Sequence, residues 1–386
     1  MAQPTSPVTV GAIRSVLESA YPPRLAESWD KVGLVCGDPA AEVTKVAFAL
    51  DCTQQVAERA VEMGAQLLVV HHPLLLRGVN SVAADTPKGM VIHTLISGGC
   101  ALFAAHTNAD SARPGVNDRL AELLGVHPGR PIEPVYADRL DKWGFQVPES
   151  DADAVKQAIF AAGAGGIGNY RCCAFQFSGR GQFTPVAGAN PTLGEVGTPH
   201  VEPEARVEFV AERWRREAIQ RALRTAHPYE EVAFDVVELA PTDDLEHACG
   251  LGRVGELDTP MTLREFTQRV ADRLPTTAWG VRAAGDPDRI IRTVAVASGA
   301  GDSFLGAAAK LGVDCYVTSD LRHHPVDEQL RESSMTIIDT AHWASEFPWT
   351  SQAAGIVESA VGERGVACEV INIRTDPWTL QASAAQ

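Results

Sequence analysis

Residues 45–72, KVAFALDCTQQVAERAVEMGAQLLVVHH, hold two apolar runs separated by one amphipathic segment. This pattern predicts a strand over 45–51, a helix over 54–64 and a second strand over 66–72. Strands this continuously apolar are buried on both faces, and a helix between them is typical of parallel strands joined by a right-handed crossover. The stretch therefore predicts an α/β fold with a mainly parallel sheet.

The same alternation continues along the chain and returns near its C-terminal end. The first part also holds helices over 8–19, 88–99 and 116–126 and a strand over 101–106; the second has strands over 292–298, 314–320 and 335–340 and a helix over 303–312. The repeated order indicates an internal duplication that gives two similar α/β lobes.

The segment between the lobes has a different pattern. It is predicted to form a βαββαβ-like series, which is typical of a compact ferredoxin-like module. We therefore expect a first α/β lobe at 1–137, an inserted α+β domain at 138–244 and a second α/β lobe at 245–386. Within the insert, an arginine-rich amphipathic helix is expected to bury Trp214 in its apolar stripe.

Composition and charge limit the class of function. The chain has 386 residues, 45% of them hydrophobic and 21% charged, which is ordinary for a globular protein of more than one domain. A formal net charge of −16 disfavours nucleic-acid binding, because phosphate backbones are bound through positive charge. The first residues lack a basic region followed by a long apolar run, and no apolar stretch approaches eighteen residues, so we expect neither a signal peptide nor a membrane span. Eight cysteines without a C-x-x-C pair fit reduced thiols, so we expect a cytoplasmic protein.

Histidines and carboxylates gather at the ends of the predicted strands, where open α/β sheets bind their ligands. The first lobe has His71-His72 after one strand, and His106 with Asp110 after the next; the second has His323-His324 and then His342 with Glu346. The alternative for any single histidine is a structural residue that only forms hydrogen bonds.

The pattern as a whole predicts a site for two metal ions. Neighbouring side chains on an extended backbone point to opposite sides, so His71 and His72 would reach different ions. Imidazole and carboxylate ligands suit zinc, iron, manganese or nickel. Two such cations would activate water for hydrolysis.

Three other motifs have two interpretations each. The turn SGAGD at 298–302 could bind an anion through its backbone N–H groups or be a plain tight turn. Trp29 beside Asp30 could shape a site or an interface, or pack in the core. The stretch HPYEE at 227–231 could bind a ligand in the insert or form a helix-to-strand turn.

Together these motifs closely resemble the Nif-three-like family, also described as GTP cyclohydrolase I type 2 homologues. The matching stretches are SWDKVGLVCGDP, VAFALDCT, LLVVHHPLLLRG, FAAHTNADSARPGVN, SGAGDS and IIDTAHWASE. The insert resembles the PII-like domain of the longer bacterial members. The resemblance implies two α/β lobes, a toroidal homohexamer and a dinuclear metal centre. The implied ligands are His71, His72, Asp110, His342 and a bridging Glu346, and His106, His323 and His324 would be neighbours of the metals.

The chain departs from the family pattern at a few positions and loses none of the implied ligands. Lys31 stands where Asn is common, Ser319-Asp320 where Gly-Asp is common, and Ala341 where Gly is common. The resemblance implies metal-dependent hydrolysis of a nucleotide or similar small molecule, with GTP ring opening as the family label suggests. His106 or His324 would then transfer protons. The alternative is a regulatory or metal-handling protein whose PII-like insert binds a small ligand or a partner.

Overall fold

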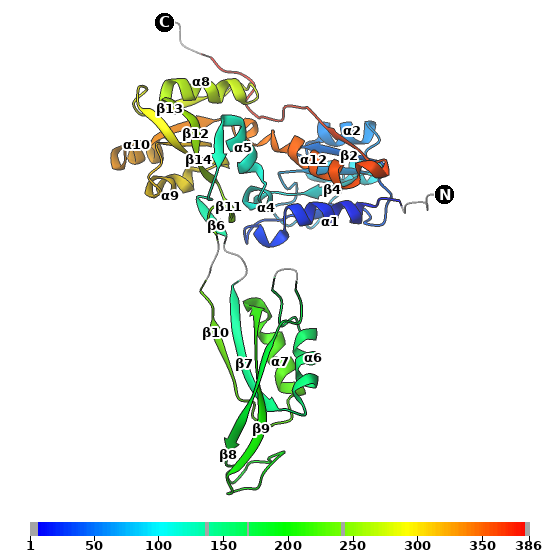
Figure 1. Ribbon diagram of the computed structural model, residues 1–386. Coiled ribbons are helices and arrows are strands. Elements are labelled where there is room, and N and C mark those ends of the chain that lie inside the picture. The colour runs from blue at the N-terminus through cyan, green and yellow to red at the C-terminus, as the bar shows by residue number, and fades with distance from the viewer. Residues whose placement is uncertain (1–6, 136–138, 168–169, 241–243, 383–386) are drawn as a thin grey trace. The chain divides into compact units, whose positions relative to one another are not determined.

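The computed structural model describes residues 7–135, 139–167, 170–240 and 244–382, and its elements are labelled in Figure 1. The fold is mixed α/β with several sheets. It divides into two compact units, one formed by Met1–Val135 together with Asp244–Gln386 and the other by Tyr136–Asp243. Within the described ranges, no helix is both long and apolar enough to cross a membrane.

The larger unit contains a five-stranded sheet with the order β1-β4-β3-β2-β17. All neighbouring strands in it are parallel except β1, which runs antiparallel to β4. The strands are β1 (Gly33–Cys36), β2 (Lys45–Ala49), β3 (Leu67–Val70), β4 (Ala101–Ala104) and β17 (Ala367–Val370), and the covering helices are α1 (Val10–Ala20), α2 (Gln54–Glu62), α3 (Pro87–Ser97) and α12 (Trp349–Val361). The strand–helix–strand order predicted from residues 45–72 is present.

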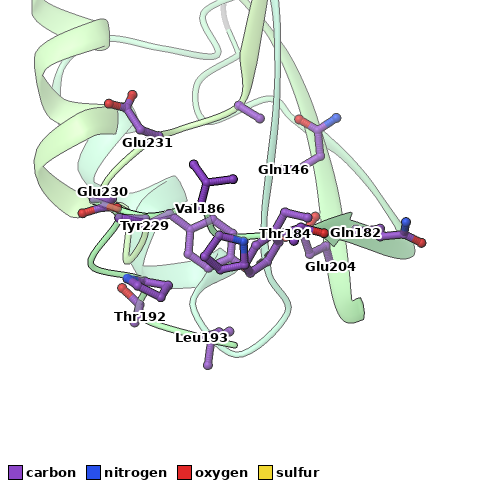
Figure 2. A pocket seen from close by; sticks show the side chains of 16 residues that line it. Gln146, Gln182, Thr184, Val186, Thr192, Leu193, Glu204, Tyr229, Glu230 and Glu231 are labelled. Carbon is purple, nitrogen blue, oxygen red and sulfur yellow. Dashed lines mark hydrogen bonds between the residues drawn. The ribbon is translucent and has the colours of Figure 1, made fainter. Parts of the chain in front are cut away.

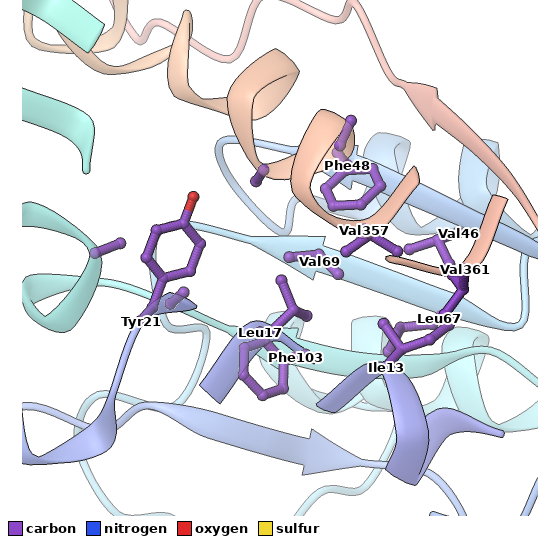
Figure 3. Close-up of a cluster of buried hydrophobic side chains, with 14 of the residues drawn as sticks. Ile13, Leu17, Tyr21, Val46, Phe48, Leu67, Val69, Phe103, Val357 and Val361 are labelled. Atoms are coloured by element: carbon purple, nitrogen blue, oxygen red, sulfur yellow. The ribbon is translucent and has the colours of Figure 1, made fainter. Parts of the chain in front are cut away.

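Alternate residues of these strands pack on opposite faces of the sheet, which explains the continuous apolar runs. Phe48 and Val69 lie on the face covered by α1 and α12, and Figure 3 shows them beside Leu17 and Val357 of those helices. Ala47, Leu68 and their neighbours pack on the other face with α2 and α3. The sheet is therefore the middle of three layers.

A six-stranded sheet with the order β13-β16-β15-β14-β12-β5 forms the rest of the larger unit's core. Its central strands β14, β15 and β16 are parallel, and its outer strands pair antiparallel. The strands are β5 (Val126–Pro128), β12 (Arg253–Thr262), β13 (Arg282–Ala284), β14 (Ile290–Ala300), β15 (Cys315–Ser319) and β16 (Thr336–Thr340). Helices α5 (Val116–Leu124) and α8 (Leu263–Arg273) cover one face, and α9 (Leu305–Lys310) and α10 (His323–Glu332) cover the other.

Helix α10 was missing from the sequence expectation, which placed the strand at 335–340 directly after the strand at 314–320. The two strands are parallel in the structure. Parallel neighbours need a crossover connection, and α10 provides it.

The two sheets exchange segments, so that neither lobe is continuous in sequence. Strand β5, which precedes the insert, pairs with β12 of the second sheet, and β17 near the C-terminal end pairs with β2 of the first. A short ladder of β6 (Glu133–Val135) with β11 (Cys249–Leu251) lies between these segments in the chain. This exchange explains why the two lobes form one compact unit.

The smaller unit is a four-stranded antiparallel sheet of order β10-β7-β9-β8 with two helices. In chain order its elements are β7 (Leu140–Pro148), α6 (Ala152–Ala161), β8 (Phe175–Phe183), β9 (His200–Glu212), α7 (Arg216–Ala226) and β10 (Phe234–Glu238). Ile219 and Leu223 of α7 pack on Trp143 and Phe145 of β7 in its core. Trp214 lies before α7 and is 65% exposed, so the expectation that it is buried was wrong.

Candidate metal centre

The carboxyl ends of parallel strands from both sheets lie around one cluster of polar side chains. His71 and His72 follow β3, and His106 follows β4. From the other sheet, β16 leads through Ala341 into the short helix α11 (His342–Glu346). The side chains that meet there are His71, His72, His106, Asp110, His342 and Glu346.

Two five-residue helices place each acid beside its histidine. Helix α4 (Thr107–Ser111) begins after His106 and carries Asp110, and α11 begins at His342 and ends at Glu346. Residues four apart on a helix lie on the same face. In α11 this spacing places His342 Nε2 3.1 Å from Glu346 Oε2.

All four imidazoles have the same ring nitrogen engaged. Each Nδ1 faces an oxygen acceptor, so each ring carries its proton there and keeps a lone pair on Nε2 for a metal. The four contacts are His71 with Ala105 O at 2.8 Å, His72 with Asp51 Oδ1 at 2.7 Å, His106 with Asp30 Oδ1 at 2.9 Å, and His342 with Asp320 Oδ2 at 2.7 Å.

Glu346 belongs to two groups of three side chains whose ligand atoms lie close together. One group is His72, His342 and Glu346, and the other is His71, Asp110 and Glu346. Glu346 Oε2 lies 2.9 Å from His72 Nε2, whereas Oε1 lies 3.7 Å from His71 Nε2. The two carboxylate oxygens thus face different groups, which is the arrangement of a carboxylate that bridges two ions.

The cluster is a good fit for cations because it leaves buried ligand atoms without hydrogen bonds. Among the described residues, His71 Nε2 and Glu346 Oε2 are buried and have no hydrogen-bond partner, although two imidazole nitrogens lie within 3.1 Å of that oxygen. Buried polar atoms normally have partners, and these would gain them from metal ions.

The charges of the cluster point the same way. Burial opposes a proton on His72 and on His342, but Glu346 and the carboxylates bonded to their Nδ1 atoms raise the pKa of these imidazoles to about 10 and about 11. Burial, together with the nearby Glu346, raises the pKa of Asp110. A field that favours protons on these nitrogens also favours a metal cation in their place.

A cavity of about 410 Å³ opens beside the cluster. Its lining includes His106, His342 and Glu346, the exposed ring of Trp29 and the segment from Ser298 to Ala300. Trp29 is 55% exposed and its ring centre lies 6.0 Å from that of His106. The site-shaping interpretation of Trp29 therefore holds, and the core-packing one was wrong.

The stretch SGAGD borders the cluster. Ser298 Oγ donates to Asp110 Oδ1 at 3.3 Å, and the amide of Gly299 donates to Ser345. A Cβ on Gly299 would lie 2.3 Å from Glu346 Oε1, and its φ of +63° also favours glycine. Glycine here gives the Glu346 carboxylate its space.

His323 and His324 do not end a strand, contrary to the sequence expectation. Strand β15 ends at Ser319, and the two histidines form the exposed first turn of α10. Their rings contact each other, and neither belongs to the described groups of possible metal ligands.

Asp51 and Asp320, which orient His72 and His342, were not identified as site residues from the sequence. Asp51 follows β2 and holds His72, while the Thr375 hydroxyl donates to its other oxygen. Asp320 follows β15 with a φ of +58°, and it holds His342. Asp320 directly follows β15, and Asp51 follows β2 after one intervening residue. This position just beyond a parallel strand is the signal that could have identified them.

Asp51→Asn is expected to weaken metal binding by about 10–100-fold, because an amide fixes the His72 tautomer less well than a carboxylate. Competition with a chromophoric chelator measures this affinity. Asp85→Asn, at an exposed acid between β3 and α3, is the matched control. Equal affinities for the two variants would show that Asp51 does not support the ligand.

Comparison with known proteins agrees with this fold and site. The chain matches the family described as Duf34/NIF3 (NGG1p interacting factor 3) over residues 8–377. A Mycobacterium tuberculosis protein named GTP cyclohydrolase 1 type 2 homolog is 51% identical over 374 residues, which is 97% of each chain. A Bacillus subtilis protein of the same name is 37% identical over 337 residues, which covers 87% of this chain and 88% of the relative.

A solved structure gives the same result. The crystal structure of a Bacillus cereus protein related to NIF3 is similar with a TM-score of 0.70 and 34% identity, over 97% of this chain and 99% of that chain. Two interleaved α/β sheets with a histidine–carboxylate cluster at their facing strand ends define the class of protein. The chain belongs to the Duf34/NIF3 family, as its motifs predicted.

Proposed function

We propose that this protein is a dinuclear metal-dependent hydrolase that acts on a nucleotide or a similar small molecule. The observation that carries the proposal is the pair of ligand groups that share Glu346. The name GTP cyclohydrolase 1 type 2 homolog, given to its relatives, supports GTP as the first substrate to test.

The proposed ligands are His71, Asp110 and Glu346 for one ion and His72, His342 and Glu346 for the other. Two divalent cations, of zinc, iron, manganese or nickel, would supply an acidified water and polarise the attacked group.

His106 is the proposed proton-transfer residue. Its Nδ1 donates to Asp30 Oδ1, and Asp30 also accepts from the backbone and hydroxyl of Thr107. Although burial opposes ionisation, these bonds hold the pKa of Asp30 well below its usual range. The ionised Asp30 would stabilise His106 when its Nε2 takes up a proton. The corresponding role for His324 stays a prediction, since that residue is exposed on α10.

The cavity beside the cluster suggests how a substrate would bind. Trp29 and Phe304 offer ring surfaces to a planar base. The described residues that line this cavity include Glu27, Glu133 and the acids of the cluster, and they include no lysine or arginine. A phosphate-bearing substrate would therefore bind only with the metal cations in place.

Metal-loaded protein is expected to turn over GTP, and Glu346→Gln is expected to lower the rate by about 100-fold or more because it disturbs both ligand groups. Product formation followed by chromatography measures the rate. The Glu58→Gln variant, on the outer surface of α2, is the charge-matched control. A wild-type rate no higher than that of Glu346→Gln, across GTP and a panel of nucleotides and phosphoesters, would reject the enzymatic function.

The competing function is that of a regulatory or metal-handling protein whose insert binds a small ligand. A pocket in the smaller unit favours it. Absence of turnover in metal-replete protein, together with ligand binding by the smaller unit, would select this alternative.

We also propose that the smaller unit is a ferredoxin-like, PII-like domain and that the chain assembles as a cytoplasmic homohexamer. The βαββαβ element order and the sheet order β10-β7-β9-β8 support the first proposal. The sequence resemblance supports the assembly. Eight free cysteines support a reducing compartment.

A further inference from the structure

The smaller unit contains a cavity of about 520 Å³, within the size range of small-molecule sites. It is formed by the end of β8, the loop after it and the turn HPYEE at 227–231. In Figure 2, Tyr229 lies among the lining residues, with Glu204 on one side and Glu230 on the other.

The loop between β8 and β9 is fastened over this cavity. The Asn190 amide donates to Glu230 Oε1 at 2.9 Å, and the Thr192 hydroxyl donates to Pro228 O at 2.7 Å. These bonds join the loop to the HPYEE turn. The turn therefore connects helix to strand, as one of its two interpretations predicted, and it also forms a wall of the cavity.

The lining combines apolar walls with negative charge. Phe183, Pro185 and Leu193 contribute apolar surface, and the ring centres of Phe183 and Tyr229 lie 5.7 Å apart. The described lining residues include three glutamates and no lysine, arginine or histidine. A ligand that matches this surface has an apolar body and a positive charge.

Glu204 carries the argument for a cation. It is only 7% exposed, and its Oε1 accepts a hydrogen bond from the Tyr229 hydroxyl at 2.9 Å. No ion pair to Glu204 occurs among the described residues. A buried carboxylate without a cation is costly, so this position would gain from a charged ligand.

The chain itself creates the space for this carboxylate. Gly181 of β8 lies against it, and a Cβ at that position would be 2.0 Å from Glu204 Oε2. Any side chain at Gly181 would push the carboxylate away from the strand.

Nearby basic groups are already engaged. His227 accepts from the Tyr229 backbone amide through Nδ1 and donates from Nε2 to Gln146 O, which is the pattern of a neutral ring. Burial also lowers the pKa of His227. Arg206, two residues after Glu204, pairs with Asp235 at 2.7 Å. Neither group supplies the positive charge that Glu204 lacks.

We propose that this pocket binds an organic cation, an ammonium or guanidinium group on an apolar or aromatic body. The charged group would lie against Glu204, beside the rings of Tyr229 and Phe183, which also attract cations. The apolar body would lie against Leu193 and Pro185. This site is separate from the metal centre and does not depend on the proposed hydrolase activity.

Binding of small probes to the full-length, metal-loaded protein tests the proposal. Benzamidine and phenethylamine are expected to bind saturably by ligand-observed NMR and calorimetry, and their neutral isosteres benzamide and 2-phenylethanol at least about tenfold more weakly. Glu204→Gln keeps an acceptor for the Tyr229 hydroxyl, and it is expected to weaken the binding of both cations by about tenfold or more. Glu195→Gln, an exposed acid on the same loop, is the control and is expected to bind them like the wild type.

Three results would overturn the proposal: no saturable binding of either cation, equal binding of the neutral isosteres, or unchanged binding by Glu204→Gln with an unchanged melting temperature. The same chemistry could come from a lysine or arginine of a second copy of this chain. Light scattering separates the two sources. If the molar mass of the assembly is unchanged in Glu204→Gln, the cation comes from a free small molecule. A reduced molar mass would show that it comes from a second copy of the chain and would overturn the proposal.

Discussion

Glu346→Ala is expected to remove most of the metal that the protein binds, from about two ions per chain to well below one. Glu346 belongs both to the group with His72 and His342 and to the group with His71 and Asp110. Each of its two oxygens faces a different set of imidazoles. Its loss would also leave the half-buried Asp110 as the only carboxylate among the six side chains of the cluster. Elemental analysis after dialysis against metal-free buffer measures the content.

Single-site variants make this prediction sharper. His72→Ala and Asp110→Ala each disturb one of the two groups that contain Glu346, so each is expected to retain about one ion. His93→Ala, an exposed histidine on α3, is the control and is expected to retain both. Full metal content in Glu346→Ala would contradict the bridging role.

Arg253→Ala is expected to lower the free energy of unfolding of the larger unit by about 3–5 kcal/mol. Arg253 of β12 is fully buried, and its Nε and Nη2 donate to the two oxygens of Asp118 of α5, each at 2.8 Å. It also donates to the carbonyl oxygens of Gly250, Gly252 and Ala112. The variant would leave a buried carboxylate and three buried carbonyls without these donors.

Hydrogen exchange of β14 and β15, which lie in the core of that unit, measures the effect. Arg322→Ala is the control, because Arg322 is 76% exposed in its pair with Asp302, and its loss is expected to cost at most about 1 kcal/mol. Equal losses of unfolding free energy in the two variants would show that the buried hydrogen bonds of Arg253 do not stabilise the unit.

The parallel strands could be predicted from the sequence because strands that are buried on both faces have continuous apolar runs. The runs at 45–49 and 67–70 are apolar at every position except Lys45, since alternate residues serve two cores. No comparable sequence pattern predicts that β5 pairs in the second sheet and β17 in the first. These pairings join residues far apart in the chain, and either short strand could pair with either sheet.

The sequence His-His-Pro occurs twice, at 71–73 and at 323–325, but the two copies have different backbone structures. After β3, Pro73 follows a strand whose last ladder residue is Val70. After β15, Asp320 in the left-handed region turns the chain, and Pro325 lies in the first turn of α10, where its missing N–H costs nothing. Only the backbone between Ser319 and His323 distinguishes the two, and its conformation is not evident from the letters.

The histidines and acids of the cluster were all recognised, but their grouping was not. Which imidazole faces which oxygen of Glu346 depends on the approach of the two sheets. That approach also brings His106 beside His71 and His72 as a possible third group, where the resemblance implied only a neighbour of the metals.

The most direct test is an anomalous difference map from crystals of the metal-loaded protein. Two peaks per chain are expected, one bounded by His72, His342 and Glu346 and the other by His71, Asp110 and Glu346. A single peak held by His71, His72 and His106, or no peak at these side chains, would contradict a dinuclear centre bridged by Glu346.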